Sequence, residues 1–203
     1  MRLSFVIGLL ASLFFFGCSN QNSTAPTVRQ LDHKIIDTRL TENIGTTDPV
    51  LIGSNDSNFF VYKYKTRIYV VGSRKMSQKF SKQHHLPYTR TILGAGPTGE
   101  TVIFEVQKKN SAYVNRLQEK FESTPKLLSS QPSFHVWKFK GRIYVIGKDK
   151  THKAFRTNLF LPYTKTILGA GPSGETVIFE VDKKNGNFAD GLKQKYQQMV
   201  SKG

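Results

Sequence analysis

The sequence is short of cysteine and of acidic residues. Cys18 is the only cysteine among 203 residues, which excludes a fold held together by internal disulfides. Asp and Glu total 14 against 30 Lys and Arg, so the formal net charge is +16. Such a charge attracts anionic partners, although an excess of lysine also serves simply to keep a protein soluble.

A long apolar run is also lacking. Residues 3–16 are mostly apolar and follow Arg2, but this stretch is too short to cross a bilayer as a helix of the mature protein. The pattern is typical of the hydrophobic part of a secretory signal, so we expect export from the cytoplasm.

Gly17 and Cys18, directly after this run, resemble the lipobox of bacterial lipoproteins. The resemblance implies a signal peptide over residues 1–17 and acylation, including palmitate, of Cys18 as the new N-terminus. Multiple acyl chains on one residue anchor a protein stably to a membrane. Because Ser19 follows the cysteine, similarity to the sorting rules of enteric bacteria implies the outer membrane of a Gram-negative cell.

Residues 18–58 are rich in Asn, Thr, Asp, Ser and Gln, with scattered apolar residues. This composition predicts a flexible tether with a reach of roughly 35 Å.

An internal duplication follows the tether. Residues 59–110 align without a gap to residues 134–185, with 33 identities in 52 positions. The alignment predicts repeat 1 over residues 59–124 and repeat 2 over residues 134–203. Between them, residues 125–133 contain two prolines and several serines and are predicted to be a connector.

The apolar periodicity of each copy predicts its secondary structure. In copy 1, aromatics alternate with lysines over residues 60–65, and β-branched residues recur over 67–72 and 100–106, as in strands. A short helix is expected around Phe80, and a closing helix follows Asn110. We therefore predict an α+β fold of two tandem units, each ordered strand, strand, helix, strand, strand, helix, with helices on one face of a four-stranded antiparallel sheet.

The stretches Gly141–Val145 and Gly169–Val177, with their counterparts in copy 1, are similar to short domains of unknown function in proteobacterial proteins. The resemblance covers both repeats and brings no activity and no functional residue with it.

The glycine loops at residues 94–99 and 169–174 match the GxGxxG pattern of dinucleotide sites. A phosphate-binding loop opens onto a helix, whereas here a β-branched strand follows, and Pro97 and Pro172 each remove an amide donor. We predict hairpin turns and no nucleotide, and we expect no cofactor and no metal.

The candidate binding residues are the basic side chains at the first hairpin of each copy. These are Lys63, Lys65, Arg67, Lys138, Lys140 and Arg142. Aromatics between the lysines would suit stacking of single-stranded nucleic acid, but alternation on a half-buried strand is the simpler explanation, and export disfavours nucleic acid.

Catalysis has weaker support. Glu100 and Glu105 recur in both copies with Arg67, and a carboxylate pair is the machinery of glycan hydrolysis. The two glutamates are an odd number apart, however, and would point to opposite faces of one strand. The sequence shows no constellation of serine, cysteine and histidine, because His84 and His85 are not repeated in copy 2.

The leading hypothesis is a non-enzymatic envelope lipoprotein, held to the membrane by its lipid, with two basic binding modules. Its partner would be an anionic lipid, an acidic polysaccharide or an envelope protein. The alternative is a glycan-acting envelope enzyme that uses the repeated Glu and Arg residues.

Overall fold

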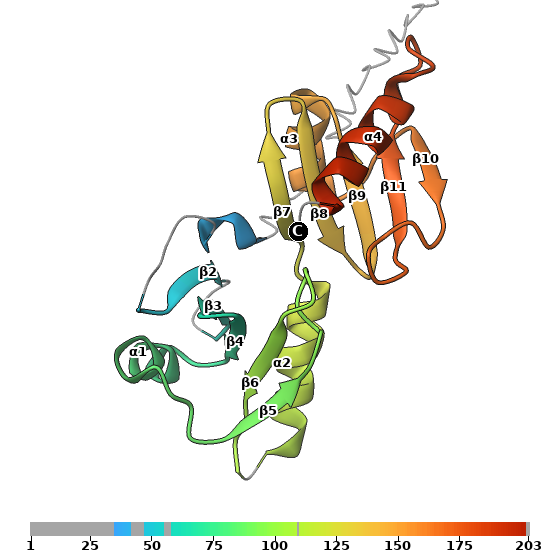
Figure 1. The fold of residues 1–203 in the computed structure, drawn as a ribbon. Helices are drawn as coiled ribbons and strands as arrows, with labels where there is room; N and C mark the ends of the chain where they lie inside the picture. The colour runs from blue at the N-terminus through green and yellow to red at the C-terminus, as the bar shows by residue number, and fades with distance from the viewer. Residues whose placement is uncertain (1–34, 42–46, 55–57, 109, 202–203) are drawn as a thin grey trace, which may run out of the picture. The chain divides into compact units, whose positions relative to one another are not determined.

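The computed structural model describes residues 35–41, 47–54, 58–108 and 110–201 (Figure 1). The signal peptide and the predicted lipidation site, Cys18, lie outside these residues. None of the described helices is long and apolar enough to cross a membrane.

The described strands form one mixed sheet of 11 strands, in the order β10-β11-β9-β8-β7-β1-β2-β3-β4-β6-β5. The elements of copy 1 are β3 (Phe60–Tyr64), β4 (Arg67–Val71), α1 (Arg74–Gln83), β5 (Thr89–Ile92), β6 (Thr101–Glu105) and α2 (Ser111–Ser123). Those of copy 2 are β8 (Phe134–Phe139), β9 (Arg142–Ile146), α3 (Asp149–Asn158), β10 (Thr164–Ile167), β11 (Thr176–Glu180) and α4 (Phe188–Val200). The expected fold of two units with separate antiparallel sheets is therefore wrong.

The strand pairing departs from the expected one inside each copy as well. β4 pairs with β6 in parallel, with Arg67 opposite Thr101, and β9 pairs with β11 in the same way, with Arg142 opposite Thr176. β6 is buried along almost its whole length, whereas β5 is exposed. A strand that is apolar on both faces needs neighbours and cover on both sides, so β6 lies inside the sheet and the polar β5 takes the edge.

Helices cover both faces of the sheet, not one. Phe80 of α1 packs with Phe60 and Tyr62 of β3, while Leu117 of α2 packs with Val61 from the other side of the same strand. Copy 2 repeats this arrangement, with α3 and α4 on opposite faces (Figure 1). Successive residues of β3 and β8 are therefore buried alternately on the two faces, which explains why these strands have no solvent-facing side in their first half.

The chain before copy 1 contributes to the sheet. β1 (Ile36–Asp37) is followed by a 3-10 helix, η1 (Thr38–Thr41), and β2 (Val50–Ser54) pairs with both β1 and β3. β1 also pairs in parallel with β7 (Lys126–Gln131), the strand formed by the predicted connector. Two segments of the predicted tether, β1 and β2, thus belong to the sheet, and β1 joins the strands of the two copies.

Candidate functional site

The predicted basic residues of copy 1 have separate surroundings. The Nζ of Lys63 lies 2.6 Å from Oε1 of Glu100, so this lysine is paired rather than presented to solvent. Lys65 is exposed in the β3–β4 turn at a φ of 53°, with its ammonium 5.2 Å from the centre of the Tyr64 ring. Arg67 is exposed at the start of β4.

Copy 2 repeats this pattern with one addition. Lys138 lies 2.6 Å from Glu175, Lys140 is exposed with its ammonium 5.3 Å from the Phe139 ring, and Arg142 is exposed. Lys138 also donates to the carbonyl oxygen of Pro97 at 3.3 Å. The glycine loop of copy 1 is therefore in contact with the first hairpin of copy 2.

The glycine loops are hairpin turns, as predicted, because β5 and β6, and β10 and β11, pair antiparallel on either side of them. In copy 1 the Glu100 carboxylate closes the turn by accepting the Thr98 N–H at 2.9 Å in addition to Lys63. Burial raises the pKa of Glu100, but these hydrogen bonds outweigh it and hold the pKa below its usual value. The paired lysine and glutamate are thus part of the turn.

The glutamates considered for catalysis do not converge. Glu100 precedes β6 and Glu105 is its last residue, so about 17 Å of strand separates them. Glu105 is buried and accepts the Gly72 N–H at 2.8 Å and the Tyr113 hydroxyl at 3.0 Å. Each carboxylate is bound to groups of its own copy, and the pair has no shared space for a glycosidic bond.

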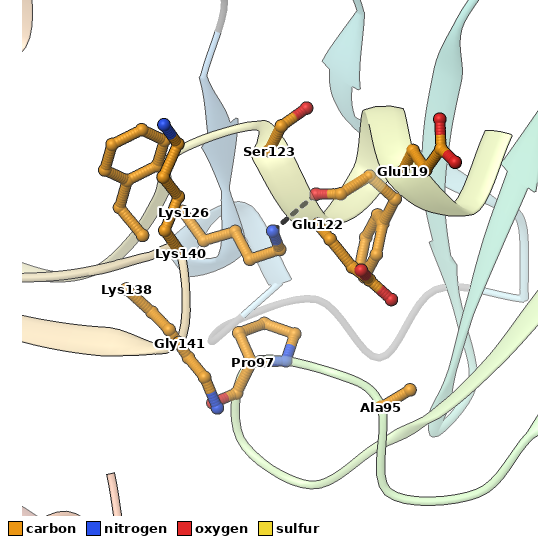
Figure 2. A pocket seen from close by; sticks show the side chains of 11 residues that line it. Ala95, Pro97, Glu119, Glu122, Ser123, Lys126, Lys138, Lys140 and Gly141 are labelled. Atoms are coloured by element: carbon orange, nitrogen blue, oxygen red, sulfur yellow. Dashed lines mark hydrogen bonds between the residues drawn. The ribbon is translucent and has the colours of Figure 1, made fainter. Parts of the chain in front are cut away.

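Three lysines, Lys126, Lys138 and Lys140, line a cleft of about 480 Å³ (Figure 2). We call it the lysine cleft. Its lining residues are Ala95, Pro97, Glu119, Phe121, Glu122, Ser123, Lys126, Lys138, Phe139, Lys140 and Gly141. Two of the six predicted binding residues, Lys138 and Lys140, therefore contribute to it, and the predicted residues of copy 1 do not.

Lys126, the third lysine, is only 5% exposed. Its ammonium donates to the carbonyl oxygens of Phe121 at 2.6 Å and Thr124 at 2.9 Å, at the C-terminal end of α2, where a positive charge is favourable. Burial, and then the charge of Lys138, lower the pKa of Lys126 from 10.5 to about 8, while Glu122 acts in the opposite sense. Lys126 and Lys138 therefore repel each other across a partly desolvated site.

Lys126 is not among the predicted binding residues, because it falls in the predicted connector. The strand pairing shows which residue of copy 1 corresponds to Lys126. Lys126 lies opposite Lys138, and Val50 lies opposite Lys63 in copy 1. The replacement of a valine by a lysine within an apolar strand is a signal that an alignment including β2 and β7 would have revealed.

A second polar cluster, in copy 2, brings a serine, an aspartate and two histidines together. In copy 2, Ser130 Oγ lies 2.7 Å from Nδ1 of His135, and Nε2 of His135 lies 2.9 Å from Asp149. The His135 ring stacks on His152 with 3.6 Å between centroids. We call this group the histidine cluster.

Desolvation dominates the electrostatics of the histidine cluster. Burial, followed by the charge of His135, lowers the pKa of His152 from 6.5 to about 4. Among the described residues, the Nε2 atom of His152 is a buried nitrogen without a hydrogen-bond partner. The cluster links β7, β8 and α3. No group of three His, Cys, Asp or Glu in the described part of the chain is placed to hold a metal ion.

Comparison of this chain with protein-family models, with curated proteins and with solved structures found no match, so no function carries over from a relative.

Proposed function

We propose that this protein is a lipid-anchored envelope protein whose lysine cleft binds phosphate or carboxylate groups of an anionic envelope component. The observation that carries the proposal is that Lys126, Lys138 and Lys140 all line one cleft of a chain with a net charge of +16. Anionic lipid headgroups and acidic polysaccharides share this chemistry.

The electrostatics of the cleft favour an anion physically. Lys138 destabilises the charged form of Lys126, so an anion placed near both ammonium groups relieves their repulsion and raises the pKa of Lys126. Binding would then be accompanied by proton uptake. Phe139, which also lines the cleft and is half-buried, offers apolar surface for the uncharged part of the ligand.

The cleft also carries Glu119 and Glu122 on the side of α2. The positive side is therefore the β8–β9 hairpin, where Lys140 is exposed and Lys138 is paired with Glu175. A ligand with discrete charged groups fits this asymmetry better than a uniformly dense polyanion does, because the acidic side repels continuous negative charge.

Attachment to the membrane rests on the resemblance of Gly17 and Cys18 to a lipobox. Labelling cells with an alkyne fatty acid should tag the wild-type protein and not Cys18→Ser. Equal labelling of the two proteins would exclude the anchor.

The cleft is tested with two variants that change charge equally. Lys140→Glu alters the cleft, whereas Lys65→Glu alters the equivalent turn of copy 1, which does not line it. The lipid-free protein should bind vesicles containing phosphatidylglycerol, or an acidic polysaccharide, and the two titrations distinguish these sources. We expect Lys140→Glu to weaken binding by about tenfold and Lys65→Glu to have less effect at 0.15 M salt, where charges about 8 Å apart or more are screened.

The dependence on pH gives an independent readout. Binding should weaken as the pH rises through about 8, where Lys126 loses its proton. Lys126→Val should remove this dependence. Equal effects of Lys65→Glu and Lys140→Glu would indicate a general attraction to the basic surface and would rule out the cleft as the site.

A further inference from the structure

The two copies have diverged unevenly, and the most similar stretch includes exposed residues. Residues 86–110 and 161–185 share 22 of 25 positions, whereas α1 and α3 share 2 of 10. Core packing accounts for the identity within β6 and β11, which are buried. It does not account for identical residues on the surface.

Exposed apolar residues are among those retained. Tyr88 and Leu93, which flank β5, are 44% and 81% exposed, and Tyr163 and Leu168, which flank β10, are 47% and 80% exposed. The turns require Gly94 and Gly99, at φ of 67° and 94°, but they do not require a leucine in solvent. Retention of a solvent-exposed leucine in both copies therefore indicates a contact made outside this chain.

The retained residues lie at the two ends of the sheet. β5 and β10 are the last strands in the strand order, and an edge strand presents backbone N–H and C=O groups for pairing. Val106 donates its N–H to the Tyr88 carbonyl, so by the alternation of an antiparallel pair Thr89 and Thr91 point their backbone groups to the open side. The equivalent bond from Val181 to Tyr163 gives β10 the same arrangement.

Charge on the edge strands normally discourages pairing, but here the charged side chains are held to one side. Arg90 donates to the Asn115 side chain of α2 at 2.9 Å, and Lys165 pairs with Asp190 of α4 at 2.7 Å. These contacts hold the charged groups of Arg90 and Lys165 over α2 and α4. The two charges therefore lie beside the open edges of the sheet and do not extend across them.

We propose that β5 and β10 each bind an extended acidic segment of another protein as an additional strand. The free backbone groups supply the strand pairing, while Leu93 and Leu168 contact apolar side chains of the added segment. Basic residues favour an acidic partner: besides Arg90 and Lys165, the ammonium of Lys108 lies 4.5 Å from the Tyr88 ring and that of Lys183 lies 4.2 Å from the Tyr163 ring. A second copy of this chain, with the same positive charge, fits these edges less well.

The test uses the lipidated protein in neutral detergent with fluorescent ten-residue peptides in which Glu alternates with Val or Leu. We expect saturable binding with two sites per chain, and none for peptides with Lys in place of Glu. The double variant Thr91→Pro with Thr166→Pro removes an outward N–H from each edge and should abolish binding. Leu93→Ser with Leu168→Ser, which leaves the backbone intact, should weaken binding by about tenfold.

Two controls separate this site from others. Leu51→Ser changes an exposed leucine on the inner strand β2 and should leave peptide binding unchanged, as should Lys140→Glu, which disables the lysine cleft. Circular dichroism checks that each variant is folded. Absence of binding at about 1 mM peptide, equal binding of the Lys peptides, or full binding by the folded leucine double variant would overturn the proposal. Self-association of the protein through these edges would assign them to a second copy instead.

Discussion

The two copies have the same backbone arrangement, but their side chains differ in the layer beneath the first helix of each copy. Their strand registers coincide at a spacing of 75 residues, as in the pairs Tyr62–Tyr69 and Trp137–Tyr144. Under α1, the Tyr62 hydroxyl lies 2.5 Å from the Ser77 hydroxyl. Under α3, Trp137 and His152 occupy these two positions, with ring centroids 5.7 Å apart.

The comparison distinguishes residues that the backbone conformation requires from residues that only fill space in the interior. The distance from lysine Nζ to glutamate Oε1 is 2.6 Å in both Lys63–Glu100 and Lys138–Glu175. In each copy the glutamate also accepts a backbone N–H of the glycine turn, so the turn depends on it. The layer beneath α1 and α3 carries no such constraint. At the same three places it has accepted either a phenylalanine, a tyrosine and a serine or a tryptophan with two histidines.

The largest expected difference between the copies comes from truncating their central aromatic residues. Trp137 is fully buried, and Trp137→Ala should lower the free energy of unfolding by about 3–5 kcal/mol through loss of buried surface and creation of a cavity. Tyr62→Ala, the equivalent change, should cost less because the smaller side chain leaves a smaller void. Urea denaturation of both variants measures the comparison.

Trp137→Tyr provides the control for this prediction, since it places the residue of copy 1 in copy 2 and retains most of the buried area. It should cost less than Trp137→Ala. Equal losses for Trp137→Ala and Tyr62→Ala would show that the two copies depend equally on this layer.

Local features of the fold were accessible from the sequence. Glycine and proline at the turns predicted the β5–β6 and β10–β11 hairpins. In the closing helix, Tyr113, Leu117 and Phe121 are spaced four residues apart, which predicts one apolar face, and Leu117 and Phe121 are buried while Tyr113 is partly buried. The parallel pairing of β4 with β6 does not follow from the alternation over residues 60–65, because alternation predicts a strand with one solvent-facing side. The nearly continuous apolar run of Val102, Ile103 and Phe104 indicates burial on both faces, which is typical of an internal strand.

Residues that occur in only one copy are not revealed by aligning the two copies. The two copies do not share their histidines: His135 and His152 stand where copy 1 has Phe60 and Ser77, so a comparison of the copies does not point to them. Their contact with Ser130 and Asp149 depends on the pairing of β7 with β8. No sequence spacing reveals this pairing when β7 is assigned to a connector.

Acid should destabilise copy 2 selectively. His152 has a folded pKa of about 4, below its unfolded value of 6.5, and it faces His135, Asp149, Arg156 and Arg39. Between these pH values the unfolded chain binds more protons, so stability is fully present above pH 6.5 and is lost as the pH falls toward 4, by up to about 3 kcal/mol. Unfolding by urea at several pH values measures this loss.

His152→Ser, which introduces the residue of copy 1, should reduce the loss of stability between pH 6.5 and 4. Ser77→Ala is the matched control, since it alters the equivalent position of copy 1 without a titrating group. An unchanged acid profile in His152→Ser would assign the acid sensitivity to other groups.

Lys126→Val tests the difference between β7 and β2 at the lysine cleft. The folded pKa of Lys126 is about 8 and its ordinary value is 10.5, so the unfolded chain binds more protons between these values. The wild type should therefore gain stability as the pH rises through this range, at up to about 1.4 kcal/mol per pH unit. The variant, with the residue that copy 1 has at Val50, should lack this gain in thermal unfolding between pH 8 and 10, and the same slope in both proteins would contradict the assignment.

The smallest expected difference concerns the first turns of α1 and α3, which are stabilised by different residues. Ser73 caps α1 by accepting the Met76 N–H at 3.2 Å, whereas at α3 the carboxylate of Glu180 accepts the Lys148 N–H at 3.0 Å and the Thr151 hydroxyl at 2.6 Å. Ser73→Ala should therefore cost about 1 kcal/mol. Lys148→Ser, which gives copy 2 the cap residue of copy 1, should change stability by less, because Glu180 already binds the start of the helix. A gain of 1 kcal/mol or more in Lys148→Ser, measured by urea denaturation, would show that the glutamate does not replace the serine cap.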